Sequence, residues 1–430
     1  MTNTPIRSPL SASAVAGLKK RYRSESLYRR LGLGAICASL GFLAFLLASI
    51  LQQGGGAFFK TEIRFDITAE AQMDAEGDAF ILLRTTLRNS LQGANTRAAR
   101  RQAYALAGAD AEEQLQAILN GTQSTGATPG DPMPFSIWLS ASDEVDFAVK
   151  SGLVNLMETD AQNIGQTRLT TTQLNWLAKL ESDGEIRTPF NLGFLTNGDS
   201  RDAERAGLGG AIMGSLFTLM LCFVTSFFVG VMAAVYLEEF APKNLFTAFL
   251  EVNINNLASV PSIIFGLLGL AIFLNMFGMP RSSSLVGGMV LALMTLPTVI
   301  IASRVSLQSV PPSIREAALA LGATRIQAVF HHVVPLALPG MLTGAILGMA
   351  RALGETAPLL MIGMVAFIAD PPSSVLDPAA ALPVQVFLWS DSPERAFAEK
   401  TSGAILVLIL FLILMNGAAI MLRKKFEKKW

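Results

Sequence analysis

Long apolar runs separated by short polar segments dominate the chain. A bilayer span takes ~20 apolar residues, and five runs without a charged residue approach or exceed this length: 31–51, 208–237, 257–279, 285–302 and 404–422. A sixth run, 339–368, is long enough but contains Arg351 and Glu355. The pattern predicts an all-α polytopic membrane protein with six transmembrane helices.

The segment 52–206 interrupts this pattern and predicts an inserted α+β domain. Its length allows a core of its own. Alternation of polar and apolar residues over 60–68 predicts a half-buried strand, and apolar residues three and four apart predict helices. The expected elements are strands over 60–68 and 136–140, helices over 76–92, 97–119 and 170–182, and a loop over 121–134. We find no nucleophile elbow or phosphate loop there, and interpret the acidic cluster 143–146 as solvated surface.

Charge predicts the orientation of the chain. Residues 52–206 hold 21 acidic and 13 basic residues, a net charge of −8, although the whole chain is neutral. Basic residues gather before the first run and at the C-terminus, so the positive-inside rule places both ends in the cytoplasm. The predicted organisation is a basic tail over 1–30, a span over 31–51, an extracytoplasmic domain over 52–206, a five-span core over 207–422 and a basic tail over 423–430.

Composition excludes several classes of function. The chain is 51% hydrophobic and 15% charged, against roughly 25% charged in soluble proteins, and it has no strongly basic face for nucleic acid. Both cysteines, Cys37 and Cys222, fall inside predicted spans, which argues against a disulfide framework or a metal cluster. No Gly-x-x-x-x-Gly-Lys-Ser/Thr loop is present, so we expect no ATP hydrolysis by this chain.

The stretch 315–335, which lies between two long apolar runs, predicts a helix-turn-helix on the cytoplasmic side. Strong helix formers run to Leu321, and Gly322 permits a turn. A second short helix is expected to stop near Pro335. Ala317 and Ala318 would offer a flat face beside the charge of Glu316, suited to a docking protein. The alternative is an ordinary loop between helices. We interpret His331 and His332 as interfacial residues and not as metal ligands.

Arg351 and Glu355 are expected inside the membrane. Counted from Pro339, Arg351 is ~18 Å into its helix at 1.5 Å per residue, and charges at such depth mark pathways or pairs. Spacing of four places both side chains on one helix face, and the arginine fork suits an oxyanion. The alternative is a structural ion pair. Pro261 and Pro358 are predicted to kink their helices.

These motifs resemble those of a large family of membrane proteins and, more specifically, those of one of its subfamilies. Glu316-Ala317-Ala318 with Gly322 is similar to the EAA signature of ABC importer permeases, which docks on a cytoplasmic ATPase. Four further motifs resemble the PstA family of phosphate-specific permeases over about 207–422: 234–239, 260–267, 354–359 preceded by Arg351, and 382–386. The first 206 residues resemble the extension of a longer PstA subgroup.

The resemblance implies a type I ABC importer permease that moves inorganic phosphate across the bacterial inner membrane. Arg351, Glu355 and Thr356 would lie on the phosphate path. The implied partners are a PstC-like permease, two copies of a PstB-like ATPase that bind the ATP and Mg²⁺, and a periplasmic PstS-like binding protein. This chain itself would bind no cofactor.

Two other readings remain open at this point. Within transporters, the substrate could be another oxyanion such as sulfate, molybdate or phosphonate. In a different class, a membrane-anchored sensor would use residues 52–206 to bind ligand, but it requires a cytoplasmic output module, and the longest cytoplasmic segment expected here is short. A membrane enzyme is the third alternative, and the sequence favours it least because no cluster of catalytic groups is found at a membrane edge.

Overall fold

A computed structural model describes residues 12–68, 78–91, 93–124, 135–154, 168–365 and 367–426. Among these, five helices are long and apolar enough to cross a membrane, and a bent helix pair is a further candidate. The predicted all-α membrane protein with an α+β insertion is therefore confirmed. The chain divides into two compact units, 1–53 and 54–430.

The first unit is one long helix. Helix α1 (Ala12–Gly54) contains the apolar window expected from 31–51, within a candidate span of Ser24–Phe58. Helix α1 contains no proline, which is consistent with its being uninterrupted.

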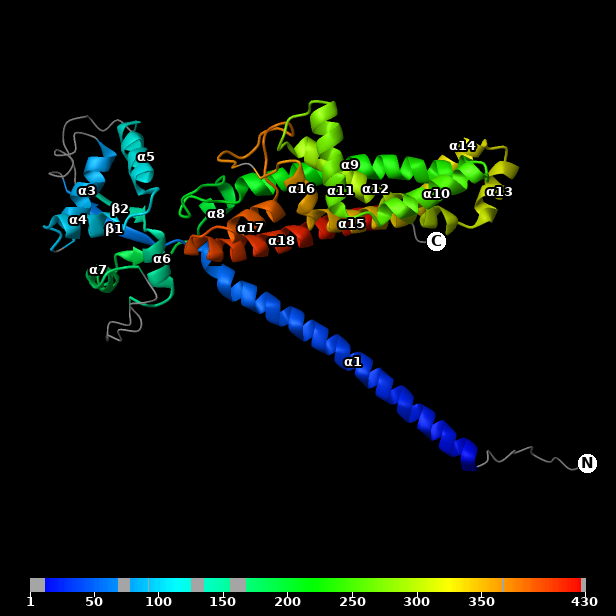
Figure 1. Ribbon diagram of the computed structural model, residues 1–430, viewed down its shortest axis with the longest axis horizontal. Helices are drawn as coiled ribbons and strands as arrows, with labels where there is room; N and C mark the ends of the chain where they lie inside the picture. Colours follow the sequence, from blue (N-terminus) through cyan, green and yellow to red (C-terminus); the bar gives the residue numbers. More distant parts are fainter. Residues whose placement is uncertain are drawn as a thin grey trace, which may run out of the picture. The chain divides into compact units, whose positions relative to one another are not determined.

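The second unit begins with a three-stranded antiparallel sheet in the order β2-β1-β3 (Figure 1). The strands are β1 (Glu62–Ile67), β2 (Phe135–Ser140) and β3 (Ile186–Arg187). Glu62 faces Ser140 and Ile67 faces Phe135 in the register of β1 and β2. The buried residues of β1 alternate with exposed ones, so both predicted strands are confirmed.

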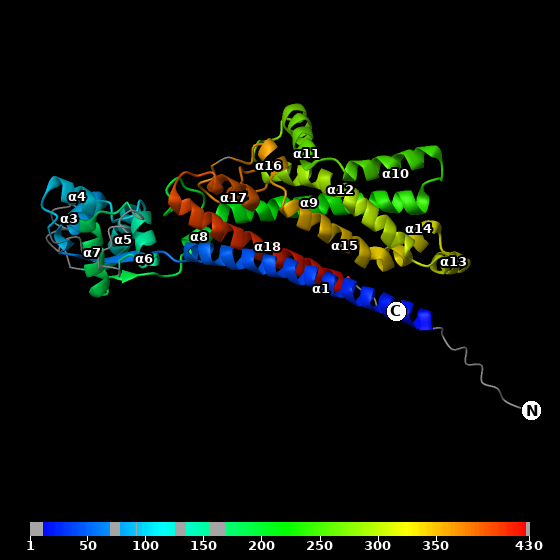
Figure 2. The same cartoon turned by 60° about the horizontal axis from the view of Figure 1, so that its bottom comes forward.

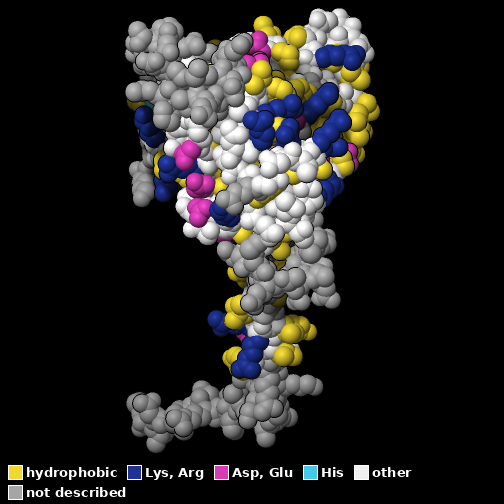
Figure 3. All heavy atoms as spheres, turned by 90° about the vertical axis from the view of Figure 1, so that its left-hand side faces the viewer, with side chains coloured by type: hydrophobic (Ala, Val, Ile, Leu, Met, Phe, Trp, Pro, Cys, Tyr) yellow, Lys and Arg dark blue, Asp and Glu magenta, His cyan; other side chains and the backbone are white. Residues whose placement is uncertain are grey.

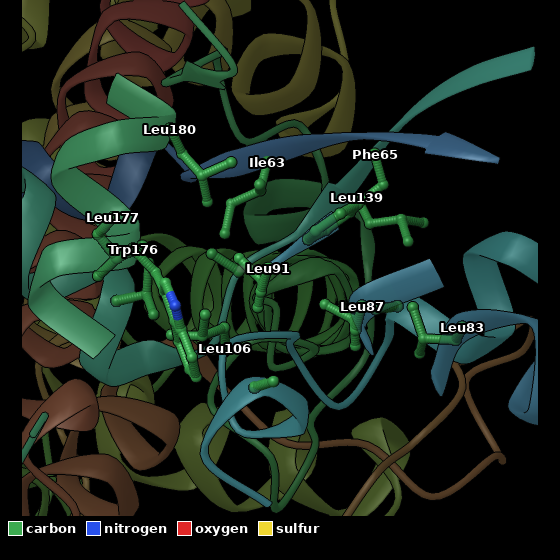
Figure 4. Close-up of a cluster of buried hydrophobic side chains, with 14 of the residues drawn as sticks. Ile63, Phe65, Leu83, Leu87, Leu91, Leu106, Leu139, Trp176, Leu177 and Leu180 are labelled. Carbon is green, nitrogen blue, oxygen red and sulfur yellow. The ribbon is translucent and has the colours of Figure 1, made fainter. Parts of the chain in front are cut away.

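Five helices accompany the sheet: α3 (Ala79–Ser90), α4 (Arg97–Tyr104), α5 (Ala111–Ser124), α6 (Asp143–Lys150) and α7 (Thr171–Ser182). Their apolar faces meet the buried face of the sheet in one core (Figure 4). Trp176 and Leu177 of α7, Leu87 of α3 and Phe65 of β1 lie in it. The single core explains how this segment can fold without disulfides.

The helix predicted over 97–119 is wrong in one respect, because it is two helices. The chain breaks between α4 and α5, where Gly108 donates its backbone N–H to the carbonyl of Ser140 at 2.8 Å. A Cβ at Gly108 would lie 2.8 Å from the carbonyl oxygen of Ala141, so only glycine fits this close approach. Helix α5 also extends into the predicted loop 121–134, and residues 125–134 lie outside the described part.

The membrane core is built on three long helices, α9 (Gly209–Val235), α12 (Ser284–Gln308) and α15 (Val334–Leu353). Helix α12 packs against both others (Figure 2). Its most apolar window is 61% buried, against 28% in α9, so α12 is the central helix. Small residues allow the contact: a Cβ at Gly288 would lie 2.6 Å from Leu221, and one at Gly344 would lie 2.2 Å from Ala302.

The remaining core helices are α8 (Gly193–Thr196), α10 (Leu245–Ala258), α11 (Ser262–Gly269), α13 (Pro312–Ala320), α14 (Arg325–Ala328), α16 (Ala357–Met361), α17 (Leu382–Ser390) and α18 (Arg395–Phe426). Helices α17 and α18 pack on each other, and α18 also packs on α15. Helix α18 contains the predicted span 404–422.

The span predicted over 257–279 is wrong. Helix α10 starts earlier, at Leu245, and ends at Ala258, and α11 follows at an angle of 103°. The apolar run continues through the break, so hydropathy does not reveal it. The backbone of Pro261 is extended and caps α11, and proline cannot donate the N–H that would continue α10.

Candidate functional site

The coupling segment, residues 315–335, begins with the predicted helix and turn. Helix α13 ends at Ala320, and Gly322 has φ +87°, a left-handed conformation that favours glycine. The N–H of Ala323 donates to the carbonyl of Ala318 at 3.1 Å, and that of Gly322 to Leu319 at 2.9 Å. These bonds satisfy carbonyls at the end of the helix. The turn predicted at Gly322 is confirmed.

The second helix of the segment does not stop near Pro335, contrary to the prediction. Thr324 and Gln327 form a capping box that starts α14. The chain then passes through a π-helical turn, Val329–Val333, directly into α15, so that Arg325–Leu353 is one 29-residue span. Pro335 follows this π-helical turn, in the first residues of α15.

The exposed face of α13 differs in part from the expected one. Glu316 and Ala317 are exposed, as are Leu319 (48%) and Leu321 (90%). Ala318 is only 7% exposed and lies against the protein, so the two alanines do not form one flat outer face. The surface open to a docking protein is therefore a carboxylate beside apolar side chains.

An ion pair fixes α13 to the end of α9. Glu239 lies in a π-helical turn, Tyr236–Phe240, that follows α9, and it is 7% exposed. The Nη2 of Arg315 lies 2.6 Å from its Oε1, and the Nε of Arg315 lies 3.1 and 3.2 Å from its two carboxylate oxygens. Remaining Arg315 donors reach the carbonyls of Val310 at 2.7 Å and Leu307 at 2.9 Å. Both charges are thus paired and hydrogen-bonded, as burial requires.

Further contacts extend this anchor. Arg325 of α14 donates to the backbone carbonyl of Glu239, and its guanidinium lies 5.5 Å from the ring centre of Phe240. Arg304 of α12 lies 2.8 Å from Glu251 of α10 and 3.5 Å from Glu238. The turn after α9 therefore contacts α12, α13 and α14, and Arg304 links it to α10.

Sequence reasoning missed this anchor. Glu238 and Glu239 stood out only as part of a motif, and Arg315 only as the start of the coupling segment. The available signal was the burial cost of two adjacent carboxylates after an apolar helix, which requires cationic partners.

Arg351 lies at the end of α15 that is farther along the chain from the coupling segment, and Glu355 follows it. Arg351 is in the last helical turn, and Gly354 caps the helix, so Glu355 and Thr356 are beyond it. The prediction of a mid-helix pair on one face is therefore wrong. The helix begins at Arg325, not Pro339, and Arg351 is about 39 Å along it at 1.5 Å per residue.

The two charges are nevertheless close. The Nε of Arg351 lies 3.7 Å from Oε1 of Glu355, and the Arg351 side chain is 50% exposed against 25% for Glu355. An ion pair with this separation and this much solvent exposure contributes little attraction. The guanidinium keeps donors available for an anion.

Pro261 and Pro358 start helices instead of kinking them, which corrects both predictions. Pro261 caps α11, and Pro358 lies in the first turn of α16. The two short helices pack on each other. Their contact at Gly266 is close, since a Cβ there would lie only 2.8 Å from Cα of Pro358. Two motifs about a hundred positions apart thus meet close to Glu355 and Thr356.

His331 and His332 are exposed in the π-helical turn before α15. Among the residues that the structure describes, no group of three or more His, Cys, Asp or Glu side chains could hold a metal ion.

Residues 226–430 match the family described as binding-protein-dependent transport system inner membrane component. The phosphate transport system permease protein PstA of Yersinia pestis is 33% identical over 223 residues, which cover 52% of this chain and 73% of that protein. The chain belongs to the PstA-type ABC importer permeases.

Two further curated relatives and one solved structure are similar to part of the chain. The probable ABC transporter permease YqgI of Bacillus subtilis is 30% identical over 251 residues, covering 55% of this chain and 84% of that protein. PstA 1 of Mycobacterium tuberculosis (strain H37Rv) is 32% identical over 221 residues, covering 50% and 70%. An inward-facing structure of the MetNI methionine ABC transporter is 19% identical with a TM-score of 0.41, and covers 51% of this chain and 97% of that chain.

Residues 15–158 match a domain of unknown function, DUF3333. The chain is therefore a PstA-type permease of the longer kind, a multi-pass protein of the inner membrane. As a transporter component of this family, it works with ATPase and binding-protein partners.

Proposed function

We propose that this chain is the permease subunit that carries inorganic phosphate into the cytoplasm in an ATP-driven importer. The observation that carries the proposal is its similarity to phosphate transport system permeases of several organisms. A half-exposed arginine at the end of α15 supports it, because its planar fork matches a phosphate oxyanion.

The proposal assigns Arg351, Glu355 and Thr356 to the phosphate path. The arginine supplies positive charge to the passing anion, and the glutamate keeps the site from holding phosphate too tightly. Glu355 competes for the same guanidinium at 3.7 Å, which favours release.

Glu316, Ala317, Ala318 and Gly322 form the coupling site for the ATPase. In this assignment the ATPase contacts Glu316 and Ala317, while Ala318 and Gly322 hold the shape of the segment. ATP and Mg²⁺ bind to two copies of a PstB-like ATPase. A PstC-like permease and a periplasmic PstS-like phosphate-binding protein complete the importer.

We further propose that both termini, 1–30 and 423–430, are cytoplasmic and that residues 52–206 are periplasmic. This orientation requires an even number of crossings, so the bent pair α10–α11 counts as one crossing. The exposed apolar side chains of α10, such as Leu245 (91%) and Phe246 (67%), support a surface covered by lipid or by a partner permease.

Phosphate uptake by the complete complex in proteoliposomes tests the proposal. Labelled phosphate is expected to accumulate with ATP inside, and unlabelled sulfate or molybdate in excess is expected not to compete. Competition by sulfate or molybdate equal to that by phosphate would contradict the substrate assignment.

Glu316→Lys is expected to release the ATPase during purification, and normal ATPase recovery with normal uptake would contradict the coupling assignment.

A further inference from the structure

A run of arginines stands out in the otherwise acidic segment 52–206. Residues 79–109 contain no aspartate, glutamate or lysine, while the segment as a whole has a net charge of −8. Helix α3 carries Arg84 and Arg88, and helix α4 carries Arg97, Arg100 and Arg101. Positive charge is thus concentrated on one small part of the domain.

Helix α4 places three of these arginines on one face. Arg97, Arg100, Arg101 and Tyr104 are three, four and seven positions apart, which is the spacing of neighbours on a helix surface. All three arginines are exposed, and Ala103 is the buried residue of this short helix. Like charges at this spacing destabilise a helix by about 0.2–0.5 kcal/mol per pair. The stability of the helix therefore does not explain why three arginines lie on one face of α4.

No carboxylate among the described residues pairs with Arg97, Arg100 or Arg101. Other arginines of the domain do have such partners: Arg187 lies 2.6 Å from Glu62, and Arg205 lies 3.1 Å from Glu113. Within the part of the chain that the structure describes, the donors of the α4 arginines are therefore open to a ligand.

The same face borders a hollow. Asn95, Arg97, Arg100, Arg101 and Tyr104 line a pocket of about 430 Å³, within the range of small-molecule sites. Figure 3 views the molecule from the end at which α3 and α4 lie, and shows a group of Lys and Arg side chains there.

The pocket wall is held in place by aromatic contacts. The guanidinium of Arg84 lies 3.7 Å from the ring centre of Phe80 and 5.0 Å from that of Tyr104. Such stacking orients a guanidinium and fixes the tyrosine that lines the pocket. Leu83 and Leu87 anchor α3 in the core, so the wall stands on a rigid element.

We propose that this pocket binds a phosphate group, and we name it the α4 arginine pocket. Three guanidinium forks can bind several oxygens of one dianion at once, whereas a single carboxylate satisfies only one fork. The phosphate group belongs either to free inorganic phosphate or to an anionic lipid headgroup. The site is separate from Arg351 and does not depend on the transport substrate.

Calorimetric titration of the full-length protein in phosphatidylcholine nanodiscs with inorganic phosphate tests the free-anion source. The triple variant Arg97→Ala, Arg100→Ala and Arg101→Ala is expected to weaken binding at least about tenfold, as loss of charged hydrogen bonds predicts. Arg168→Ala is the matched control, because it removes one arginine of the same domain whose side chain is 90% exposed. The comparison is repeated in an Arg351→Ala background, so that a loss of phosphate binding in the triple variant cannot come from the transport path.

The lipid source is tested by adding phosphatidylglycerol to the nanodiscs and measuring the unfolding midpoint. A rise in the wild type that is lost in the triple variant, without binding of inorganic phosphate, assigns the pocket to a lipid phosphate. Equal behaviour of wild type and triple variant in both arms overturns the proposal. If the alanine variant does not fold, the triple lysine variant is used, which keeps the charge and is expected to bind phosphate more weakly than the wild type.

Discussion

The buried carboxylate of Glu239 and the partly buried guanidinium of Arg315, 76 positions apart in the chain, form an ion pair with contacts of 2.6–3.2 Å. It joins the end of α9 to the first helix of the coupling segment. Any force on α13 is therefore passed to α9 as well as along the chain into α15.

Glu239→Gln is expected to lower both stability and uptake. The substitution keeps the shape but removes the charge that Arg315 needs in a buried site, at a cost of about 2 kcal/mol. The unfolding midpoint and phosphate uptake of the assembled complex measure the two effects. Glu238→Gln is the matched control, because its closest contacts, 3.0 Å to Gln308 and 3.5 Å to Arg304, are longer and its side chain is more exposed. Equal effects of both variants would show that the buried pair has no special role.

Gly322→Ala is expected to impair coupling through the backbone alone. A Cβ at Gly322 would meet no atom within 4 Å, but φ is +87°, where a side chain costs about 1–2 kcal/mol. Gly93 has the same φ and the same open surroundings, so Gly93→Ala is the matched control. Uptake and ATPase recovery are expected to fall only for Gly322→Ala. A fall of the same size for Gly93→Ala would attribute the loss to general destabilisation.

Arg351→Ala is expected to abolish phosphate uptake while the complex still assembles. Its side chain is half exposed and its pair with Glu355 is 3.7 Å long, so the free energy of unfolding should change by less than about 1 kcal/mol. Uptake is measured after recovery of the ATPase has been verified. Arg423→Ala, which removes an arginine with one 3.3 Å hydrogen bond to Thr343, is the control. Normal uptake by Arg351→Ala would remove this residue from the path.

Asp143 predicts a pH dependence of stability. Burial, and then Glu204, raise the pKa of this carboxyl from 3.8 to about 7. Between those values the folded chain holds a proton that the unfolded chain has lost. Stability from this group therefore falls as pH rises from about 4 to 7 and is constant above.

The measurement compares unfolding midpoints of wild type and Asp143→Asn. The two proteins are expected to match below about pH 4, where the carboxyl is protonated in both the folded and the unfolded state, and the variant is expected to be more stable at about pH 8, where the wild-type carboxyl is charged. Asp202→Asn, at an exposed aspartate of a nearby loop, is the control. A stability difference that is independent of pH would contradict the assignment.

The parts of the fold that follow from local composition were predictable. Helices α9, α12 and α18 coincide with uniform apolar runs, and Gly322 turns because only a left-handed conformation lets Ala323 reach the carbonyl of Ala318. Pro261 and Pro358 predicted kinks, but the complete breaks of the helix at Pro261 and after Leu353 were not predictable from hydropathy and proline position. They depend on the packing of α11 against α16, which is a contact between distant segments.

The candidate site divides in the same way. Glu316, Gly322, Arg351 and Glu355 were identified from charge, turn chemistry and spacing. The pairing of Glu239 with Arg315 requires knowledge of which helix ends meet in space. The ion pair fixes the rotation of α13 about its own axis, and this rotation turns Ala318 inward. The sequence of residues 315–335 alone does not show it.

The unbroken helix Arg325–Leu353 has a mechanical consequence. Its two ends, one in the coupling segment and one at Arg351, are about 39 Å apart at 1.5 Å per residue. It can act as a lever: a tilt of about 5° about its cytoplasmic end would displace Arg351 by about 3 Å over that length. A tilt this small, driven by the ATPase at the coupling segment, would be enough to bring the guanidinium into or out of hydrogen-bonding distance of a passing anion.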